Sequence, residues 1–192
     1  MRASFTAIDF ETANQQSNSA CQLGIAVVDK GIIVERKSWL IKPPSKVFTF
    51  SDLHGITYQM VKDQPEFPAV WSEAKQYIEQ QIIVAHNVDF DLGVLLDTLS
   101  FYHLPIPKIY AIDSLEAARK AWPNLLNHKL STVAAHLKVT LNHHDALSDA
   151  EACAQIILQA GLENIEINRT IQPVMPTAMD LFSSEFEQGG AG

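Results

Sequence analysis

The 192-residue sequence has no apolar run that approaches the roughly 18 residues needed to span a membrane. Its amino terminus lacks the long apolar segment and the small-residue cleavage site of a secretory signal. It contains only two cysteines, Cys21 and Cys153, and apolar residues surround both, so we expect small core side chains rather than a disulfide. These absences predict a cytosolic protein with no membrane partner.

Positive charge is also scarce. Fourteen lysines and arginines stand against 22 acidic residues, which gives a net charge of −8 and a pI of about 5.3. Such a chain does not coat nucleic acid by bulk electrostatic attraction, although an enzyme could still grip a short polyphosphate end through bound cations. The histidines and cysteines match no zinc-site spacing, which argues against a zinc-dependent hydrolase.

Hydrophobic patterning predicts a single α/β domain. Apolar or alternating runs predict strands over residues 4–10, 21–28, 32–41, 82–85 and 109–112. Helical spacing covers residues 67–80, 89–103, 114–122, 130–137 and 145–160. Three strands followed by alternating helices and strands predict a mixed sheet with helices on both faces. Periodicity fades near Asn164, so we expect a domain over 1–163 and a tail over 164–192 that is weakly structured or docked on it.

Two carboxylates stand at the end of the first predicted strand. Because side chains alternate along a strand, Asp9 and Glu11 share a face with Phe5 and Ala7, where a core should be. For an isolated pair of this kind, the usual explanation is that the strand ends at a solvated edge. The interpretation therefore depends on acids elsewhere in the chain.

The helix predicted over 145–160 carries an acid on its apolar side. Its stripe consists of Ala146, Asp149, Ala150, Cys153, Ile156, Ile157 and Ala160. A buried carboxylate must be protonated, paired with a cation or bound to metal, because leaving it unpaired costs several kcal/mol. The alternatives for Asp149 are a lysine or arginine partner, or a place in the first helical turn that the helix dipole favours.

The helix predicted over 89–103 repeats this pattern more weakly. Asp91 shares a face with Val94 and Leu95, but Asp89 competes with it, and periodicity alone does not choose between them. Three separate segments thus each direct a carboxylate inward, where the acids repel one another unless cations bind between them.

Oxygen ligands suit Mg²⁺ or Mn²⁺. Two such ions about 3.5–4 Å apart can clamp the attacking and leaving oxygens of a phosphodiester. That chemistry also needs a proton acceptor near neutral pH, and His144, just before the last helix, is suited by the ordinary histidine pKa of about 6.5. His143 competes with it, and the pair could instead form a surface loop or an adventitious zinc site.

Several segments together resemble the DEDDh family of 3′→5′ exonucleases, the proofreading type that includes the epsilon subunit of bacterial replicative polymerase. The three main matches are Asp9-Phe10-Glu11-Thr12 to D-x-E-T, His86-Asn87-Val88-Asp89-Phe90-Asp91 to H-N-x-x-F-D, and His144-Asp145-Ala146-Leu147-Ser148-Asp149-Ala150 to H-x-A-L-x-D-A. Shorter matches fall at 53–57, 112–115 and 127–130. The resemblance selects Asp91 over Asp89 and His144 over His143. One departure is Ser114, where the family often has threonine, but it lies outside the metal set.

The resemblance implies a ribonuclease H-like fold with a five-stranded mixed sheet in the order 3-2-1-4-5, the second strand being antiparallel. It implies that two Mg²⁺ or Mn²⁺ ions bind to Asp9, Glu11, Asp91 and Asp149, and that His144 is the general base. It also implies a set of substrate-binding residues. These are Thr12 and Ala13 at the 3′-hydroxyl, His54 and Ile56 at the terminal base, and Phe10, Asn87 and Phe90 around the pocket.

The implied activity is a 3′→5′ exonuclease that releases nucleoside 5′-monophosphates from DNA 3′ ends. An exoribonuclease or oligoribonuclease is the alternative, because spacing does not reveal contacts to the 2′-position. A non-catalytic nucleic-acid-binding module is less consistent with a chain that keeps all four acids and the histidine.

The tail contains Ala178-Met179-Asp180-Leu181-Phe182, which resembles peptides that bind the bacterial sliding clamp but lacks their leading glutamine. Met179, Leu181 and Phe182 could therefore contact a clamp or polymerase. We favour the alternative that they pack on the domain or belong to a disordered end.

Overall fold

The computed structural model describes residues 3–161, 165–167 and 169–172. Its strands are β1 (Phe5–Thr12), β2 (Ala20–Asp29), β3 (Ile32–Leu40), β4 (Ile82–Ala85), β5 (Ile109–Asp113) and β6 (Arg169–Ile171). Its helices are α1 (Ser51–His54), α2 (Tyr58–Val61), α3 (Phe67–Ala74), the 3₁₀ turn η1 (Lys75–Tyr77), α4 (Val88–Phe101), α5 (Ser114–Ala121), α6 (Leu130–Leu137) and α7 (Ala146–Ala160). None of the helices in these residues is long and apolar enough to cross a membrane. The clamp-like residues Met179, Leu181 and Phe182 lie outside the described residues.

One mixed sheet runs through the molecule in the order β3-β2-β1-β4-β5-β6. β2 is antiparallel to β1 and β3, whereas β4 is parallel to β1 and to β5. The predicted α/β class and the order of the first five strands are confirmed, but the predicted count of five strands is wrong. β6 adds antiparallel to β5, with Ile109 opposite Ile171. A three-residue strand is too short for alternation to reveal it in a sequence. The division into a domain over 1–163 and a tail stays a prediction.

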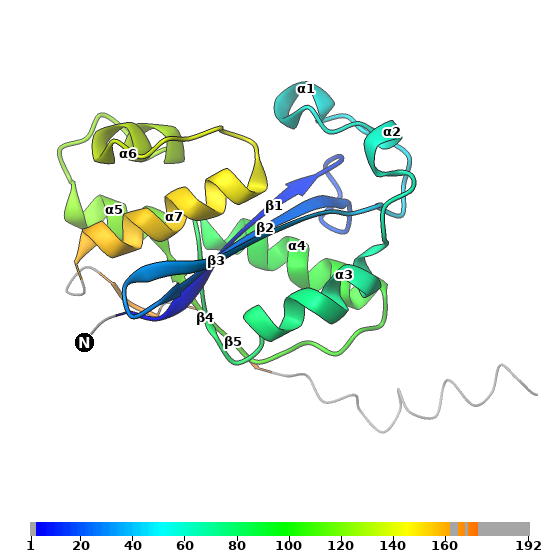
Figure 1. Cartoon of the computed structure of the whole chain (residues 1–192), viewed down its shortest axis with the longest axis horizontal. Helices are drawn as coiled ribbons and strands as arrows, with labels where there is room; N and C mark the ends of the chain where they lie inside the picture. Colours follow the sequence, from blue (N-terminus) through cyan, green and yellow to red (C-terminus); the bar gives the residue numbers. More distant parts are fainter. Residues whose placement is uncertain (1–2, 162–164, 168, 173–192) are drawn as a thin grey trace, which may run out of the picture.

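Helices cover both faces of this sheet. Figure 1 shows α5, α6 and α7 on one side and α3 and α4 on the other. β1 contributes to both layers: Ile8 and Phe10 belong to the core on the α3–α4 side, and Phe5 and Ala7 belong to the core under α7. The next side chains on the α7 side are those of Asp9 and Glu11. The alternation of β1 thus directs both acids toward α7.

The helix predicted over 67–80 is wrong in its second half. The α-helix ends at Ala74 and continues as the 3₁₀ turn η1. Ile78, just beyond η1, is fully buried, and Gln80 takes a positive φ of 61° before β4 begins. The chain therefore leaves the helical path early because the side chain of Ile78 packs into the core and the backbone must turn toward the sheet.

The segment between β3 and α3 has no assignment from sequence patterning, and it forms the short helices α1 and α2. It packs against the carboxyl end of β1 through a small apolar cluster made of Ala13, Cys21, Ile56 and Val61. This packing brings α1 beside the end of β1 that carries the two acids.

Candidate active site

At Asp9 and Glu11, β1 pairs with β2 but no longer with β4. Parallel pairing with β4 covers Thr6 and Ala7 and goes no further. Beyond that point, the amide of Phe10 donates instead to the carboxylate Oδ1 of Asp91, in the first turn of α4, over 2.9 Å. The gap between β1 and β4 thus brings the acid of α4 to the end of β1.

Asp149 approaches the same place from α7. It is only 3% exposed and lies in the first helical turn, whose amino end is capped by Asp145. Its Oδ2 accepts hydrogen bonds from the backbone amide of His144 (3.1 Å) and from the ring Nδ1 of His143 (3.0 Å). Its Oδ1 is buried and has no hydrogen-bond partner in the described part of the chain. A buried acceptor oxygen without a hydrogen bond destabilises the folded state unless a cation or a proton binds to it.

Carboxylates from β1 and α7 converge. Oxygens of Asp9, Glu11 and Asp149 all lie within 4.8 Å of one another. Asp91 falls outside this close trio but is near enough for its charge to raise the pKa of Asp9. Asp89, by contrast, points away from the trio and forms a two-point ion pair with Arg169 of β6. In the described residues, no lysine or arginine forms an ion pair with any of the four converging acids.

Burial and mutual repulsion raise the pKa of these acids. Burial raises the pKa of Asp9 well above its ordinary value, and the charges of Asp91 and Asp149 raise it further. Burial, together with Asp149, raises the pKa of Glu11 to about 7, and burial raises that of Asp91 to about 8. The pKa of Asp149 is raised mainly by burial. Near neutral pH the cluster must therefore retain protons or bind cations.

The imidazole of His144 lies at the edge of this cluster. Its Nδ1 is 3.9 Å from Oε1 of Glu11. Burial lowers the pKa of the ring below 6.5, and the neighbouring His143 lowers it further. A neutral ring near physiological pH can accept a proton. The backbone of His144 has a φ of 69°, a left-handed conformation, which turns its amide toward Asp149.

The predicted substrate-binding residues divide into three groups. Phe10, Thr12 and the half-exposed Phe90 line a cleft of about 470 Å³ that Asp9, Glu11 and Asp149, but not Asp91, also line. Ala13 and Asn87 do not line it. Ala13 is fully buried, and its amide and carbonyl are already engaged by Ser19, Thr49 and Phe50. The backbone amide of Asn87 donates a hydrogen bond to the carboxylate of Asp113.

His54 and Ile56 line an adjoining cleft of about 320 Å³ that shares Leu53, His143 and His144 with the first. The ring Nε2 of His54 donates to the carbonyl of Thr12 (3.1 Å), so Nδ1 accepts from the amide of Ile56 (3.0 Å). Burial lowers the pKa of His54, which favours this neutral form. The ring therefore ties α1 to the end of β1.

Lys129 also lines the first cleft, although the sequence analysis assigned no role to it. Among the described residues that line the 470 Å³ cleft it is the single lysine or arginine, and its side chain is exposed. Its loop is held in place because His86 contacts the carbonyl of His128 (2.7 Å) and His128 contacts the carbonyl of Trp122 (3.0 Å). The only signal in the sequence was a short motif match at 127–130, which says nothing about the direction of the side chain.

Comparison with known proteins gives a family match over most of the chain. The RNase T exonuclease family model matches residues 6–157. A DNA polymerase III of the PolC type from Halalkalibacterium halodurans is 34% identical over 157 residues, which are 80% of this chain and 11% of that protein. The 3′-5′ exonuclease DinG of Bacillus subtilis is 32% identical over 160 residues, 81% of this chain and 17% of DinG. The chain thus spans less than a fifth of the length of these relatives.

Solved structures share the fold. Exonuclease X in complex with 5′ overhanging duplex DNA has a TM-score of 0.66 and 25% identity, covering 81% of this chain and 89% of its own. A 3′-exonuclease solved with a histone mRNA stem-loop has a TM-score of 0.71, but with 16% identity over 92% of this chain and 72% of its own it shows the fold alone. The common architecture is the ribonuclease H-like fold.

Proposed function

Because the chain belongs to the RNase T exonuclease family, we propose that it is a metal-dependent 3′→5′ exonuclease that releases nucleoside 5′-monophosphates from DNA 3′ ends. The observation that carries this proposal is the convergence of Asp9, Glu11 and Asp149 within 4.8 Å, with Asp91 beside them. No lysine or arginine in the described residues neutralises these acids. Buried acids that converge without a basic partner are typical of a cation site rather than of a structural ion-pair network.

DNA is the proposed substrate because the relatives named above include a DNA polymerase and because Exonuclease X was solved with duplex DNA. RNA remains the alternative outcome of the test described below. Low positive charge supports weak binding along the strand, so the proposed contact is with the 3′ end rather than with a long stretch of backbone.

The donor set fits divalent metal ions. Asp9, Glu11, Asp91 and Asp149 offer only oxygen ligands, which suits Mg²⁺ or Mn²⁺, and the Oδ1 of Asp149 has no other partner in the described residues. We propose that these four residues hold two such ions. When bound, paired divalent ions activate a water molecule and stabilise the charge on the leaving oxygen of a phosphodiester.

His144 is the proposed general base. The neutral ring beside Glu11 accepts a proton from the attacking water, and the backbone amide of His144 orients Asp149. Phe90 presents a half-exposed aromatic ring on which the terminal base can stack, with Phe10 and Thr12 completing that wall of the cleft. His54 and Ile56 are proposed to contact the base from the adjoining cleft.

The test is digestion of single-stranded DNA and RNA oligomers labelled at either end. A 3′→5′ exonuclease releases the 3′ label at once as a mononucleotide and converts the 5′-labelled strand into a descending ladder. EDTA should abolish both, and Asp149→Asn should fold normally but not hydrolyse. Internal cuts, release from the 5′ end or activity in EDTA would overturn the proposal, and digestion of RNA alone would establish the exoribonuclease alternative.

Two further assignments remain proposals. Contact with a clamp or polymerase through Met179, Leu181 and Phe182 is tested by a clamp pull-down with Leu181→Ala and Phe182→Ala. Action in the cytosol is consistent with Cys21 and Cys153 being buried free thiols.

A further inference from the structure

His143 and His144 place two imidazole rings on the same side of the chain. The ring centroids are 3.9 Å apart and the ring planes are inclined by 18°. Adjacent residues in an extended strand would point to opposite sides, but the positive φ of His144 reverses this arrangement. Both rings therefore face the carboxylate of Asp149.

These three residues form a second group of potential metal ligands. One nitrogen from each ring and one oxygen of Asp149 lie within 4.8 Å of one another. The side chain of His143 is 41% exposed and that of Asp149 only 4%, so the group is open to solvent at the histidine end and buried at the carboxylate end. The carboxylate of Asp149 contacts this group directly through Oδ2, which accepts a hydrogen bond from the ring Nδ1 of His143, while its buried Oδ1 has no partner in the described residues.

The proposed hydrolysis does not use His143. Its ring contacts Asp149, yet the four acids and His144 already supply the metal ligands and the base. The donor chemistry of this group also differs from that of the acids. Two nitrogens and one oxygen match the sites that hold Zn²⁺ with a fourth position open, whereas Mg²⁺ and Mn²⁺ favour oxygen ligands.

We propose that His143, His144 and Asp149 form a Zn²⁺ site that competes with the catalytic cations. Zn²⁺ at this site occupies Asp149 and the ring of His144 together. The zinc site itself does not depend on the activity of the chain. Its consequence, inhibition of hydrolysis by Zn²⁺, rests on the proposed function.

The binding test uses the full chain without nucleic acid. Zn²⁺ affinity is measured by competition with a chromophoric chelator, and Co²⁺ is added separately to record the visible absorption bands of tetrahedral cobalt. We expect His143→Asn to weaken Zn²⁺ binding by at least about tenfold and to remove the cobalt bands, because it removes a ligand. The control is His103→Asn, an exposed histidine outside this group whose positive φ, 53°, asparagine tolerates. It should bind Zn²⁺ like the wild type.

A second measurement separates loss of a ligand from general damage. The rise in melting temperature on adding Mn²⁺ should be the same in His143→Asn as in the wild type, because the oxygen ligands remain. Unchanged Zn²⁺ affinity in His143→Asn, or equal loss of the Mn²⁺ and Zn²⁺ responses, would overturn the site.

The activity test compares inhibition by Zn²⁺ at fixed Mg²⁺, with each variant referred to its own rate without zinc. We expect His143→Asn to need at least about ten times more Zn²⁺ for half inhibition, in proportion to its lost affinity. If the chain does not hydrolyse DNA at all, the proposed function fails while the chelator and cobalt results still decide the zinc site. Equal sensitivity of variant and wild type to Zn²⁺ would overturn the competition.

Discussion

The first turn of α7 lies directly on Gly24 of β2, where a β-carbon would stand 2.2 Å from the carbonyl carbon and oxygen of Ala146. Gly24 is also opposite Asp9 in the register of β1 and β2. The absence of a side chain at this one position therefore lets α7 approach the sheet closely enough for Asp149 to reach Asp9 and Glu11. The geometry of the acid cluster depends on a residue that carries no functional group.

Gly24→Ala should therefore damage both stability and activity. The new methyl group must displace the backbone of Ala146, and overpacking of this kind typically costs about 1–3 kcal/mol. We expect a lower free energy of unfolding in urea and a slower hydrolysis rate, since the first turn of α7 carries Asp149. Gly93→Ala in α4 is the control: a β-carbon there meets nothing within 4 Å, so helix propensity should raise stability by up to about 1 kcal/mol. A Gly24→Ala variant as stable and active as the wild type would contradict this account.

Patterning in the sequence identifies the acids that regular elements direct inward. The alternation of β1 predicts that Asp9 and Glu11 share a face, and the apolar stripe of α7 predicts the burial of Asp149. Periodicity does not distinguish Asp89 from Asp91, because both stand in the first turn of α4. The ion pair between Asp89 and Arg169 depends on β6, a strand too short to recognise from sequence.

Contacts made by loops are beyond such reasoning. The stacking of His143 on His144 depends on one positive φ, and the position of Lys129 depends on hydrogen bonds between distant loops. Neither has a repeating pattern along the chain. The role of Gly24 is equally hidden, since a glycine in a strand reveals neither what crosses it nor how closely.

The stability of the metal-free protein should fall as pH rises from about 4.5 to 8. Glu11 has its pKa raised from an ordinary 4.5 to about 7, and Asp91 from 3.8 to about 8, so in this window these two acids hold more protons in the folded state than in the unfolded state. When the folded state binds more protons, the free energy of unfolding decreases with pH. Melting temperatures in EDTA between these pH values measure the slope, and Glu11→Gln should reduce it.

Millimolar Mg²⁺ or Mn²⁺ should oppose that decline, because cations that bind only the folded state stabilise it and relieve repulsion among the ionised acids. The metal-dependent rise in melting temperature is therefore expected to be larger at pH 8 than at pH 5. Two controls are used: buffer free of calcium, which is itself a divalent cation, and the variant Asp149→Asn, which lacks one of the proposed ligands. A metal-free protein that becomes more stable toward pH 8, or one that metals do not stabilise, would argue against a cation site.

His144→Asn tests the proposed base. Asparagine is preferable to alanine because the backbone at this position has a φ of 69°, which asparagine tolerates. Loss of a general base should lower kcat by about a hundredfold or more. The acid limb of the wild-type pH profile should have an apparent pKa below 6.5, since burial lowers the pKa of His144, and the variant should lack that limb. Retained stabilisation by Mn²⁺ is the control, and an unchanged pH profile would assign the base to another group.

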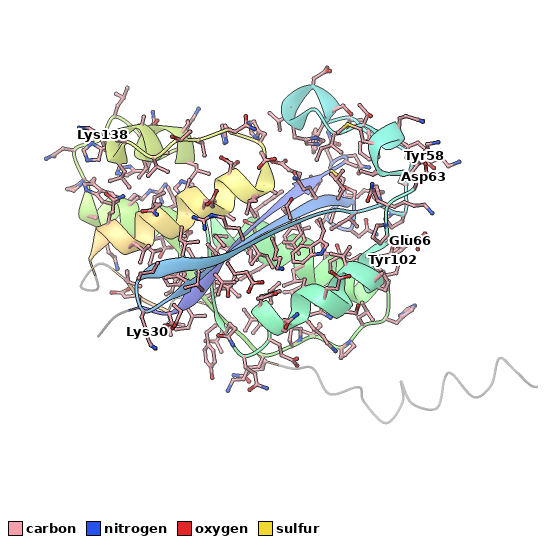
Figure 2. All side chains as sticks on the ribbon, in the orientation of Figure 1. Lys30, Tyr58, Asp63, Glu66, Tyr102 and Lys138 are labelled. Atoms are coloured by element: carbon pink, nitrogen blue, oxygen red, sulfur yellow. The ribbon has the colours of Figure 1, made fainter. Side chains whose placement is uncertain are left out.

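Lys129→Gln should weaken substrate binding without slowing the chemical step. Among the described residues Lys129 forms no ion pair and is the single lysine or arginine that lines the cleft, so its ammonium group is available to a phosphate of the bound strand. Loss of one phosphate contact on a single strand should reduce the slope of log affinity against log salt by about 0.7. We expect KM for an oligonucleotide to rise several-fold while kcat stays near the wild-type value. Lys138→Gln, at the opposite end of α6 and labelled in Figure 2, is the matched control and should change neither quantity.

A methylphosphonate placed at successive positions of the oligonucleotide then identifies the phosphate that Lys129 contacts, because at the contacted position wild type and Lys129→Gln should bind equally. If the salt slope of Lys129→Gln equals that of the wild type, the lysine does not touch the strand.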